Sequence, residues 1–163
     1  MELFDVYDEN RNPLGYTKVR GSELLPNEYN MGVEIWSINN NKLLMTQRSP
    51  LKSHAGKWEV PGGCSQTTET SLDTLIREAN EEINVDVTKD DVKLIDTIIY
   101  KKQFVDVYTS NITVDINKIK LQDEEVSDIK FFSKEEFKKL IDNNEIVESV
   151  YQRYQQIKDK IGW

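Results

Sequence analysis

Residues 63–85 read GCSQTTETSLDTLIREANEEINV and carry most of the chemically informative side chains of the chain. From about Thr68 to Ile83, apolar side chains recur at the spacing of one α-helical face. These side chains are Leu72, Leu75, Ile76, Ala79 and Ile83. Thr67 or Thr68 is a suitable N-cap, because its hydroxyl can accept a hydrogen bond from a backbone N–H of the first turn. The stretch therefore predicts an amphipathic helix that buries one face.

Three glutamates occupy the second half of this predicted helix. Glu78, Glu81 and Glu82 stand at positions i, i+3 and i+4, which places them close together on the helix surface. Like charges at this spacing repel one another and destabilise a helix. A hard divalent cation between them would relieve that repulsion, and ligands that are all oxygen suit Mg²⁺ or Mn²⁺. The spacing predicts a magnesium site, with manganese as the alternative ion.

Two glycines precede the helix. Gly62 and Gly63 allow the backbone to turn sharply and to approach a ligand closely. A carbonyl oxygen here can complete a metal shell, and the amides at the start of the helix can meet a phosphate oxygen. A glutamate-rich helix alone is usually a solvated face, so the metal hypothesis depends on the surrounding pattern.

That pattern is specific. Gly63 is followed by five residues and Glu69, and seven more residues lead to Arg77, Glu78, an aliphatic position, and the pair Glu81-Glu82. This spacing matches the Nudix box, and the chain strongly resembles a MutT-like Nudix hydrolase. One position departs from the pattern, because Asn84 stands where the family has glycine. We expect a left-handed backbone there, which asparagine tolerates better than most residues.

The resemblance extends beyond the box, over roughly residues 30–141, and it implies an α+β Nudix fold. In that fold a mixed β-sheet is sandwiched between helices, and here a β-hairpin extension precedes it. We interpret residues 1–163 as a single Nudix domain, with residues 1–29 forming the hairpin and a connector. Strands are predicted at residues 3–7, 14–19, 31–38, 42–47, 58–60, 92–100, 104–114 and 129–132. Two helices follow, one capped by Ser133 and Glu136 and one running from about Ile146 to Ile161.

The resemblance also implies roles for individual side chains. Glu78 and Glu82 are expected to be metal ligands, Glu81 a ligand or the general base, and the Gly63 or Gly62 carbonyl a further ligand. All three glutamates therefore count as candidate catalytic residues.

Four side chains complete the candidate set. Glu69 and Arg77 are expected to join the loop to the helix by an ion pair, and Arg48 could reach a phosphate. Glu125 is the leading candidate for a general base outside the box, ahead of Glu124 and Asp128. Trp58, Tyr100, Phe104 and Tyr108 could stack on a base, although strand spacing favours the core for them.

Composition limits the class of protein. A length of 163 residues suits one domain, and a net charge of −8 argues against general nucleic-acid binding. The single cysteine, Cys64, excludes an intrachain disulfide and suits a reducing cytoplasm. No apolar run approaches the ~20 residues that cross a bilayer, so no membrane partner is expected. The expected partner is a small-molecule diphosphate, and a homodimer is compatible with a hairpin that has little core of its own.

The predicted activity is Mg²⁺-dependent hydrolysis of a diphosphate linkage, in a nucleoside diphosphate derivative or related substrate, by a metal-activated water. Two alternatives come from the same resemblance. A non-catalytic nucleotide sensor usually loses box carboxylates, whereas all are present here. An isopentenyl-diphosphate isomerase uses a cysteine just before the box glycine, where this chain has Gly62. The identity of the substrate stays open.

Overall fold

The computed structural model describes the whole chain, residues 1–163. Its strands are β1 (Leu3–Tyr7), β2 (Pro13–Val19), β3 (Asn30–Asn39), β4 (Lys42–Arg48), β5 (Trp58–Glu59), β6 (Gly62–Cys64), β7 (Val92–Tyr100), β8 (Gln103–Ser110) and β9 (Val126–Ser133). Its helices are α1 (Ser71–Ile83), α2 (Lys134–Asp142) and α3 (Glu148–Ile161), with a short 3₁₀ turn at Ile116–Lys118. No helix is both long and apolar enough to cross a bilayer.

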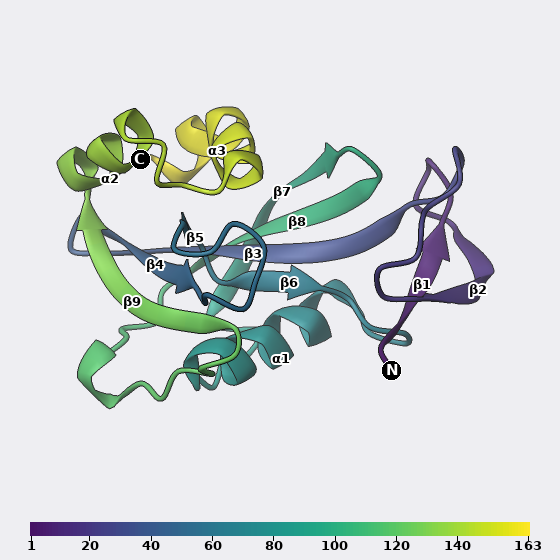
Figure 1. Ribbon diagram of the computed structural model, residues 1–163, viewed down its shortest axis with the longest axis horizontal. Helices are drawn as coiled ribbons and strands as arrows, with labels where there is room; N and C mark the ends of the chain where they lie inside the picture. Colours follow the sequence, from purple (N-terminus) through teal and green to yellow (C-terminus); the bar gives the residue numbers. More distant parts are fainter.

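A seven-stranded mixed sheet forms the centre of the molecule (Figure 1). The main order is β5-β4-β3-β8-β7, with β6 paired to β3 and β9 paired to β4. β3 and β8 run parallel, while the other pairs within this sheet are antiparallel. β1 and β2 form a separate two-stranded hairpin at the far end of the molecule from α2.

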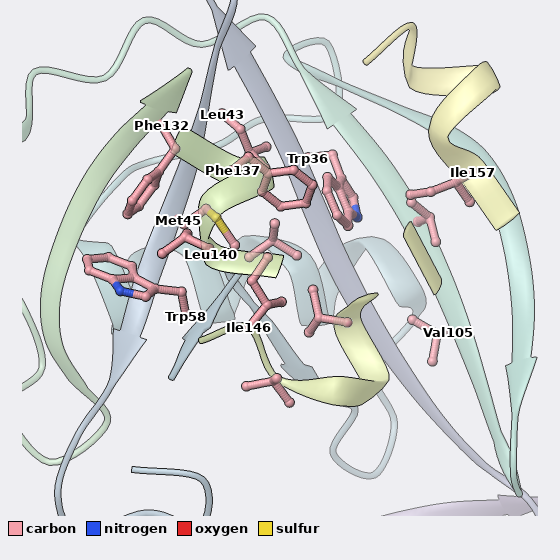
Figure 2. Packing of buried hydrophobic residues seen from close by; sticks show 14 of the residues in the cluster. Trp36, Leu43, Met45, Trp58, Val105, Phe132, Phe137, Leu140, Ile146 and Ile157 are labelled. Carbon is pink, nitrogen blue, oxygen red and sulfur yellow. The ribbon is translucent and has the colours of Figure 1, made fainter. Parts of the chain in front are cut away.

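Helices cover both faces of the sheet, with α2 and α3 on one side and α1 on the other (Figure 1). The larger core lies under α2 and α3, where Trp36 of β3 packs with Phe137 and Ile157 (Figure 2). On the opposite face, Val33 and Ile35 of β3 pack against Leu75 of α1. β3 is therefore buried on both faces, and the predicted fold, a mixed sheet sandwiched between helices, is confirmed.

The sheet divides between β3 and β4. These strands pair only at their hairpin tip, at Ile38–Leu43 and Asn39–Lys42. Beyond the tip, β5 continues along β4 and β6 continues along β3, so residues 58–64 connect the two diverging halves. The backbone N–H of Ile35 donates to the Pro61 carbonyl at 2.9 Å, which ties this crossing segment to β3. The divergence opens the space in which the functional site lies.

Several predicted element boundaries are wrong. α1 begins at Ser71 and its N-cap is Thr70, whose capping box uses Asp73, rather than Thr67 or Thr68. β8 ends at Ser110 instead of reaching Val114, and β9 begins at Val126, earlier than predicted. α3 begins at Glu148, two residues after Ile146. In each case tertiary pairing or capping, which local periodicity does not contain, sets the end of the element.

The hairpin is joined to the sheet by a partly buried ion pair. Arg11, in the β1–β2 turn, donates to both Asp106 carboxylate oxygens at 2.8 and 2.6 Å. Thr97 donates its hydroxyl to the same carboxylate at 2.6 Å. The Asp106 side chain is 3 % exposed and the Arg11 side chain 31 %, so the carboxylate is buried and the guanidinium lies at the surface above it.

Candidate functional site

A cavity of about 380 Å³ lies beside β3, between α1 on one side and α3 on the other. This is within the usual range for a small-molecule site. β6 forms its floor through Gly62 and Gly63, and the hairpin contributes Glu2 and Arg20 at its rim. The pocket at the split in the sheet therefore draws residues from eight parts of the chain, from the N-terminal hairpin to α3.

Helix α1 carries two glutamates into this pocket. Glu78 and Glu82 are one turn apart and are 8 % and 4 % exposed, alongside the buried apolar side chains Leu75, Ala79 and Ile83. The helix ends at Asn84, which adopts the left-handed conformation with φ 52° and ψ 42°. The prediction of a left-handed residue at this position is confirmed. Asparagine thus performs the backbone role that the box assigns to glycine.

Glu81 is placed differently from the other two glutamates. Its side chain is 47 % exposed, and it accepts a hydrogen bond from Arg77 Nη1 at 3.0 Å. It lines the pocket at the rim, because a three-residue step along a helix rotates the side chain away from the i and i+4 positions. The structure therefore brings Glu78 and Glu82 together inside and leaves Glu81 at the mouth.

Arg77 connects the loop before the helix to the helix itself. Its guanidinium donates to both Glu69 oxygens, at 2.6 and 3.0 Å, and to the Cys64 carbonyl at 3.0 Å. The same side chain donates to Glu78 at 2.9 Å. The expected ion pair between Arg77 and Glu69 is present, and it also fixes the position of Glu78.

Both glycines of the floor lie against other groups. A Cβ added to Gly63 would come within 2.2 Å of Glu78 Oε1, and one added to Gly62 would come within 2.2 Å of the Val33 carbonyl oxygen. The backbone N–H of Gly62 donates to Glu82 Oε2 at 3.2 Å. Gly63 thus allows the close approach of the Glu78 carboxylate to β6, and Gly62 allows the close pairing of β6 with β3.

The pocket holds an excess of negative charge. Seven carboxylates and five cationic side chains line it. Each cation has an acidic partner: Arg20 pairs with Glu2, Arg48 with Glu59, Lys52 with Glu125, Arg153 with Glu34, and Arg77 with Glu69, Glu78 and Glu81. Glu82 has no cationic partner. Burial, and then the negative charges of Glu78 and Glu59, raise the pKa of Glu82 well above its usual value.

This donor set fits a divalent cation. In their present conformations, no three acidic, histidine or cysteine side chains converge as a metal cluster, because Arg77 holds Glu78 and Glu81. The lining nevertheless carries two more negative than positive charges, and Glu82 is buried without a positive neighbour in contact. Buried carboxylates are normally paired or bind metals. Two uncompensated charges on oxygen donors match one hard divalent ion.

Two other candidates from the sequence line the same pocket. Glu125 lies at its edge in an ion pair with Lys52. Arg48 is engaged with Glu59, to which its Nη1 donates at 3.0 and 2.9 Å, and with the Ser53 carbonyl. Glu124 and Asp128 are exposed and do not line the pocket. Of the acidic residues near the start of β9, the structure therefore places only Glu125 at the site.

Most of the aromatic candidates belong to the core. Trp58, Phe104 and Tyr108 are buried, whereas Tyr100 is half-buried and lines the pocket.

Sequence reasoning missed Glu34, Glu59 and Arg153, which all line the pocket. A signal existed for Arg153, because it interrupts the apolar stripe of α3 between Val150 and Ile157.

Comparison with known proteins agrees with this geometry. The profile of the NUDIX domain matches residues 28–154. An uncharacterised Nudix hydrolase of Listeria monocytogenes is 27 % identical over 150 residues, covering 90 % of this chain and 89 % of that protein. A crystal structure of a Deinococcus radiodurans protein superposes with a TM-score of 0.74 at 22 % identity, covering 90 % of this chain and 92 % of the other.

A third similar protein has a ligand-bound structure. It is a bifunctional NMN adenylyltransferase/ADP-ribose pyrophosphatase of Francisella tularensis, in complex with AMP and a manganese ion. It superposes with a TM-score of 0.66 at 22 % identity, over 85 % of this chain and 43 % of that one. The profile match covers most of the chain and includes the whole box, so the resemblance seen in the sequence is confirmed. This chain belongs to the Nudix family and is a pyrophosphohydrolase of the class that acts on nucleoside diphosphate derivatives.

Proposed function

We propose that this chain hydrolyses the diphosphate linkage of a nucleoside diphosphate derivative, with Mg²⁺ as its metal and Mn²⁺ as a substitute. The observation that carries the proposal is Glu82, a buried carboxylate without a cationic partner, beside Glu78 in a pocket with two negative charges in excess. A divalent cation bound by these residues would neutralise diphosphate oxygens and would lower the pKa of a bound water molecule.

The side chains of the site fall into metal ligands and residues that position those ligands. Glu78 and Glu82 would hold the metal, together with the Gly63 carbonyl and Glu81 when its carboxylate turns from Arg77. Arg77 keeps the helix and the Glu69 loop in place, so the carboxylates stay fixed while substrate binds. Arg48 acts by orienting Glu59 and the loop at Ser53.

A general base must take the proton of the attacking water. Glu125 is our candidate, because its carboxylate lies at the pocket edge and is held there by Lys52. Glu81 is the competing base, since it also lies at the mouth and is half exposed. A base near the opening can pass its proton to solvent after each turnover.

Glu82→Gln tests the metal assignment. The variant should fold as well as the wild type, because glutamine has the same shape and removes a carboxylate whose charge burial disfavours. Mg²⁺-dependent turnover should fall by at least ~100-fold, as expected when one site group that stabilises transition-state charge is lost. Assays would use nucleoside diphosphates, nucleoside triphosphates and nucleotide sugars, with released phosphate measured after a coupling phosphatase.

The matched control is Glu135→Gln, an exposed glutamate in α2 outside the pocket. It should leave turnover unchanged. Full activity in Glu82→Gln would refute the metal assignment, and a wild type that is silent toward every substrate would favour a sensor.

We also propose that two chains associate as a homodimer. Exposed large apolar side chains concentrate at the N-terminal end of the chain, at Met1, Leu3, Leu14, Tyr16, Val19 and Leu25. Apolar surface of this kind is typical of an interaction site. Light scattering that gives one monomer peak would contradict this proposal.

A further inference from the structure

Arg153 is the one basic side chain of the pocket that comes from α3. It lies far from the box in sequence and on the opposite side of the sheet from α1, as Figure 1 shows for the two helices. Its side chain is only 11 % exposed, and it lines the same cavity as Glu78 and Glu82. Ser149, one turn earlier on α3, lines that wall as well.

Two contacts hold the Arg153 guanidinium in one orientation. Its Nε donates to Glu34 Oε2 at 2.8 Å, and Glu34, in β3, is 3 % exposed. The guanidinium carbon lies 5.5 Å from the centre of the Tyr100 ring, in a cation–π contact. Glu34 is itself fixed by the Trp36 indole, which donates to its Oε1 at 3.1 Å. The guanidinium is therefore oriented before any ligand arrives.

The terminal nitrogens of Arg153 are unused. Only Nε makes a hydrogen bond within the protein. In contrast, the terminal nitrogens of Arg77 bond to Glu69, Glu78, Glu81 and a carbonyl, while those of Arg48 bond to Glu59 and Ser53. An arginine has four N–H donors on its two terminal nitrogens, arranged to match phosphate oxygens. Arg153 thus offers a fixed and unsatisfied set of donors to the pocket.

The structural role of pairing with Glu34 accounts for Nε of Arg153 but not for its two terminal nitrogens. A buried ion pair is expensive to desolvate, and an apolar residue at this position of the α3 stripe would pack at lower cost. The pairing with Glu34 uses one donor and leaves both terminal nitrogens without a protein partner in a side chain that lines the pocket. Burial raises the pKa of Glu59, and the charges of Arg48, Lys52 and Arg153 act against that rise.

We propose that Arg153 binds the substrate phosphate that is not held at the α1 carboxylates, so that the diphosphate spans the pocket from α1 to α3. This inference rests on the proposed diphosphate hydrolysis. It restricts the substrate class to molecules with two linked anionic phosphorus groups, one of which lies at the α1 carboxylates and the other at Arg153 of α3. Arg153 is then a binding residue for the phosphate on the α3 side.

The test measures binding of methylene diphosphonate, which carries two linked phosphorus groups, has no nucleoside and resists hydrolysis. Isothermal titration calorimetry in the presence of Mg²⁺ would compare it with inorganic phosphate. One variant is Arg153→Lys, which keeps a charge for Glu34 but loses the forked donors. The second is Glu34→Gln with Arg153→Gln, which removes both charges and leaves no buried carboxylate unpaired. Lys158→Gln, an exposed lysine on the same helix, is the matched control.

We expect both Arg153 variants to bind the diphosphonate roughly ten- to a hundredfold more weakly, the loss typical of a charge-assisted hydrogen bond. Phosphate binding should change less than threefold, as one phosphorus group can still occupy the α1 side, and Lys158→Gln should behave as wild type. Thermal unfolding would show that each variant is folded.

Three results would overturn the assignment of Arg153. These are unchanged diphosphonate affinity in both variants, an equal loss for inorganic phosphate, and a wild type that binds no diphosphonate. The hydrolysis screen separates this failure from that of the proposed function. A wild type that hydrolyses diphosphates, with the same KM in the Arg153 variants, refutes only the role of Arg153.

Discussion

At the scale of single residues, the site depends on two neighbouring glycines that have different tasks. Gly62 lies against the backbone of β3, whereas Gly63 lies against the carboxylate of Glu78. Backbone within a paired strand cannot move aside, but the end of a glutamate side chain can. A side chain at Gly62 should therefore affect mainly the stability of the fold, and a side chain at Gly63 mainly the geometry of the site.

A methyl group at each glycine should have a different effect. Gly62→Ala places a Cβ 2.2 Å from the Val33 carbonyl oxygen and should lower the free energy of unfolding by about 1–3 kcal/mol, as overpacking does. Gly63→Ala should cost less stability, because the Glu78 carboxylate can swing away, but that movement should remove most turnover. Denaturant unfolding and a Mg²⁺-dependent assay on both variants would check this. A Gly63→Ala protein with wild-type activity would show that the position of Glu78 is unimportant.

Most of the site residues that were predicted lie within one local motif, and Arg48 and Glu125 are the two outside it. Glu78, Glu81, Glu82, Gly63, Glu69 and Arg77 share the box spacing, and all except Glu69 line the pocket. Glu34 and Arg153 are 119 positions apart, and no local spacing relates them. Their pairing follows from α3 packing on β3, which is a property of the assembled fold.

At the scale of elements, periodicity located the strands and helices well but set their ends poorly. The alternating and helical patterns identified β3, β4, β7 and α1. β6 was missed, because Gly62-Gly63-Cys64 has no strand propensity and becomes a strand only by pairing with β3. Capping instead sets where helix α1 begins. The Thr70 hydroxyl accepts a hydrogen bond from the Asp73 backbone N–H, and the Asp73 carboxylate accepts one from the Thr70 backbone N–H.

The end of α1 gives a prediction about its unusual cap. Asn84 has φ 52°, and its N–H donates to the Asn80 carbonyl at 2.9 Å. Asn84→Ala should lower the free energy of unfolding by about 1 kcal/mol, because a Cβ without a compensating polar group is strained in this conformation. Asn84→Gly should lie within ~0.5 kcal/mol of wild type, since relief of strain is offset by a more flexible unfolded chain. Thermal or urea unfolding of both variants measures this, and equal stability of Asn84→Ala would contradict it.

At the scale of the whole molecule, the hairpin contacts the sheet and also contributes residues to the candidate pocket. Arg11 fastens the hairpin to Asp106 on β8, and the same hairpin brings Glu2 and Arg20 to the rim of the pocket. On the opposite side, α3 brings Arg153. The pocket therefore combines the spacing of one motif with contributions from both ends of the chain, which local sequence patterns could not bring together.

The Arg11–Asp106 ion pair should make the free energy of unfolding depend on pH in the acid range. Burial alone would raise the pKa of Asp106, but hydrogen bonds from Arg11 and Thr97 hold it below its usual value. A depressed folded-state pKa means that the unfolded chain binds the proton more readily. The contribution to stability is therefore complete above about pH 4, the ordinary aspartate value, and is lost as pH falls below it.

Asp106→Asn isolates this contribution. At neutral pH the variant should unfold more easily by about 3 kcal/mol, because it breaks a buried pair and leaves Arg11 without its anion. The difference between the two proteins should shrink as pH falls below about 4, where the wild type loses the same interaction. Urea unfolding across the acid range measures both free energies. A difference that stays constant with pH would show that the Asp106 charge does not hold the hairpin, and the loss at neutral pH would then reflect packing alone.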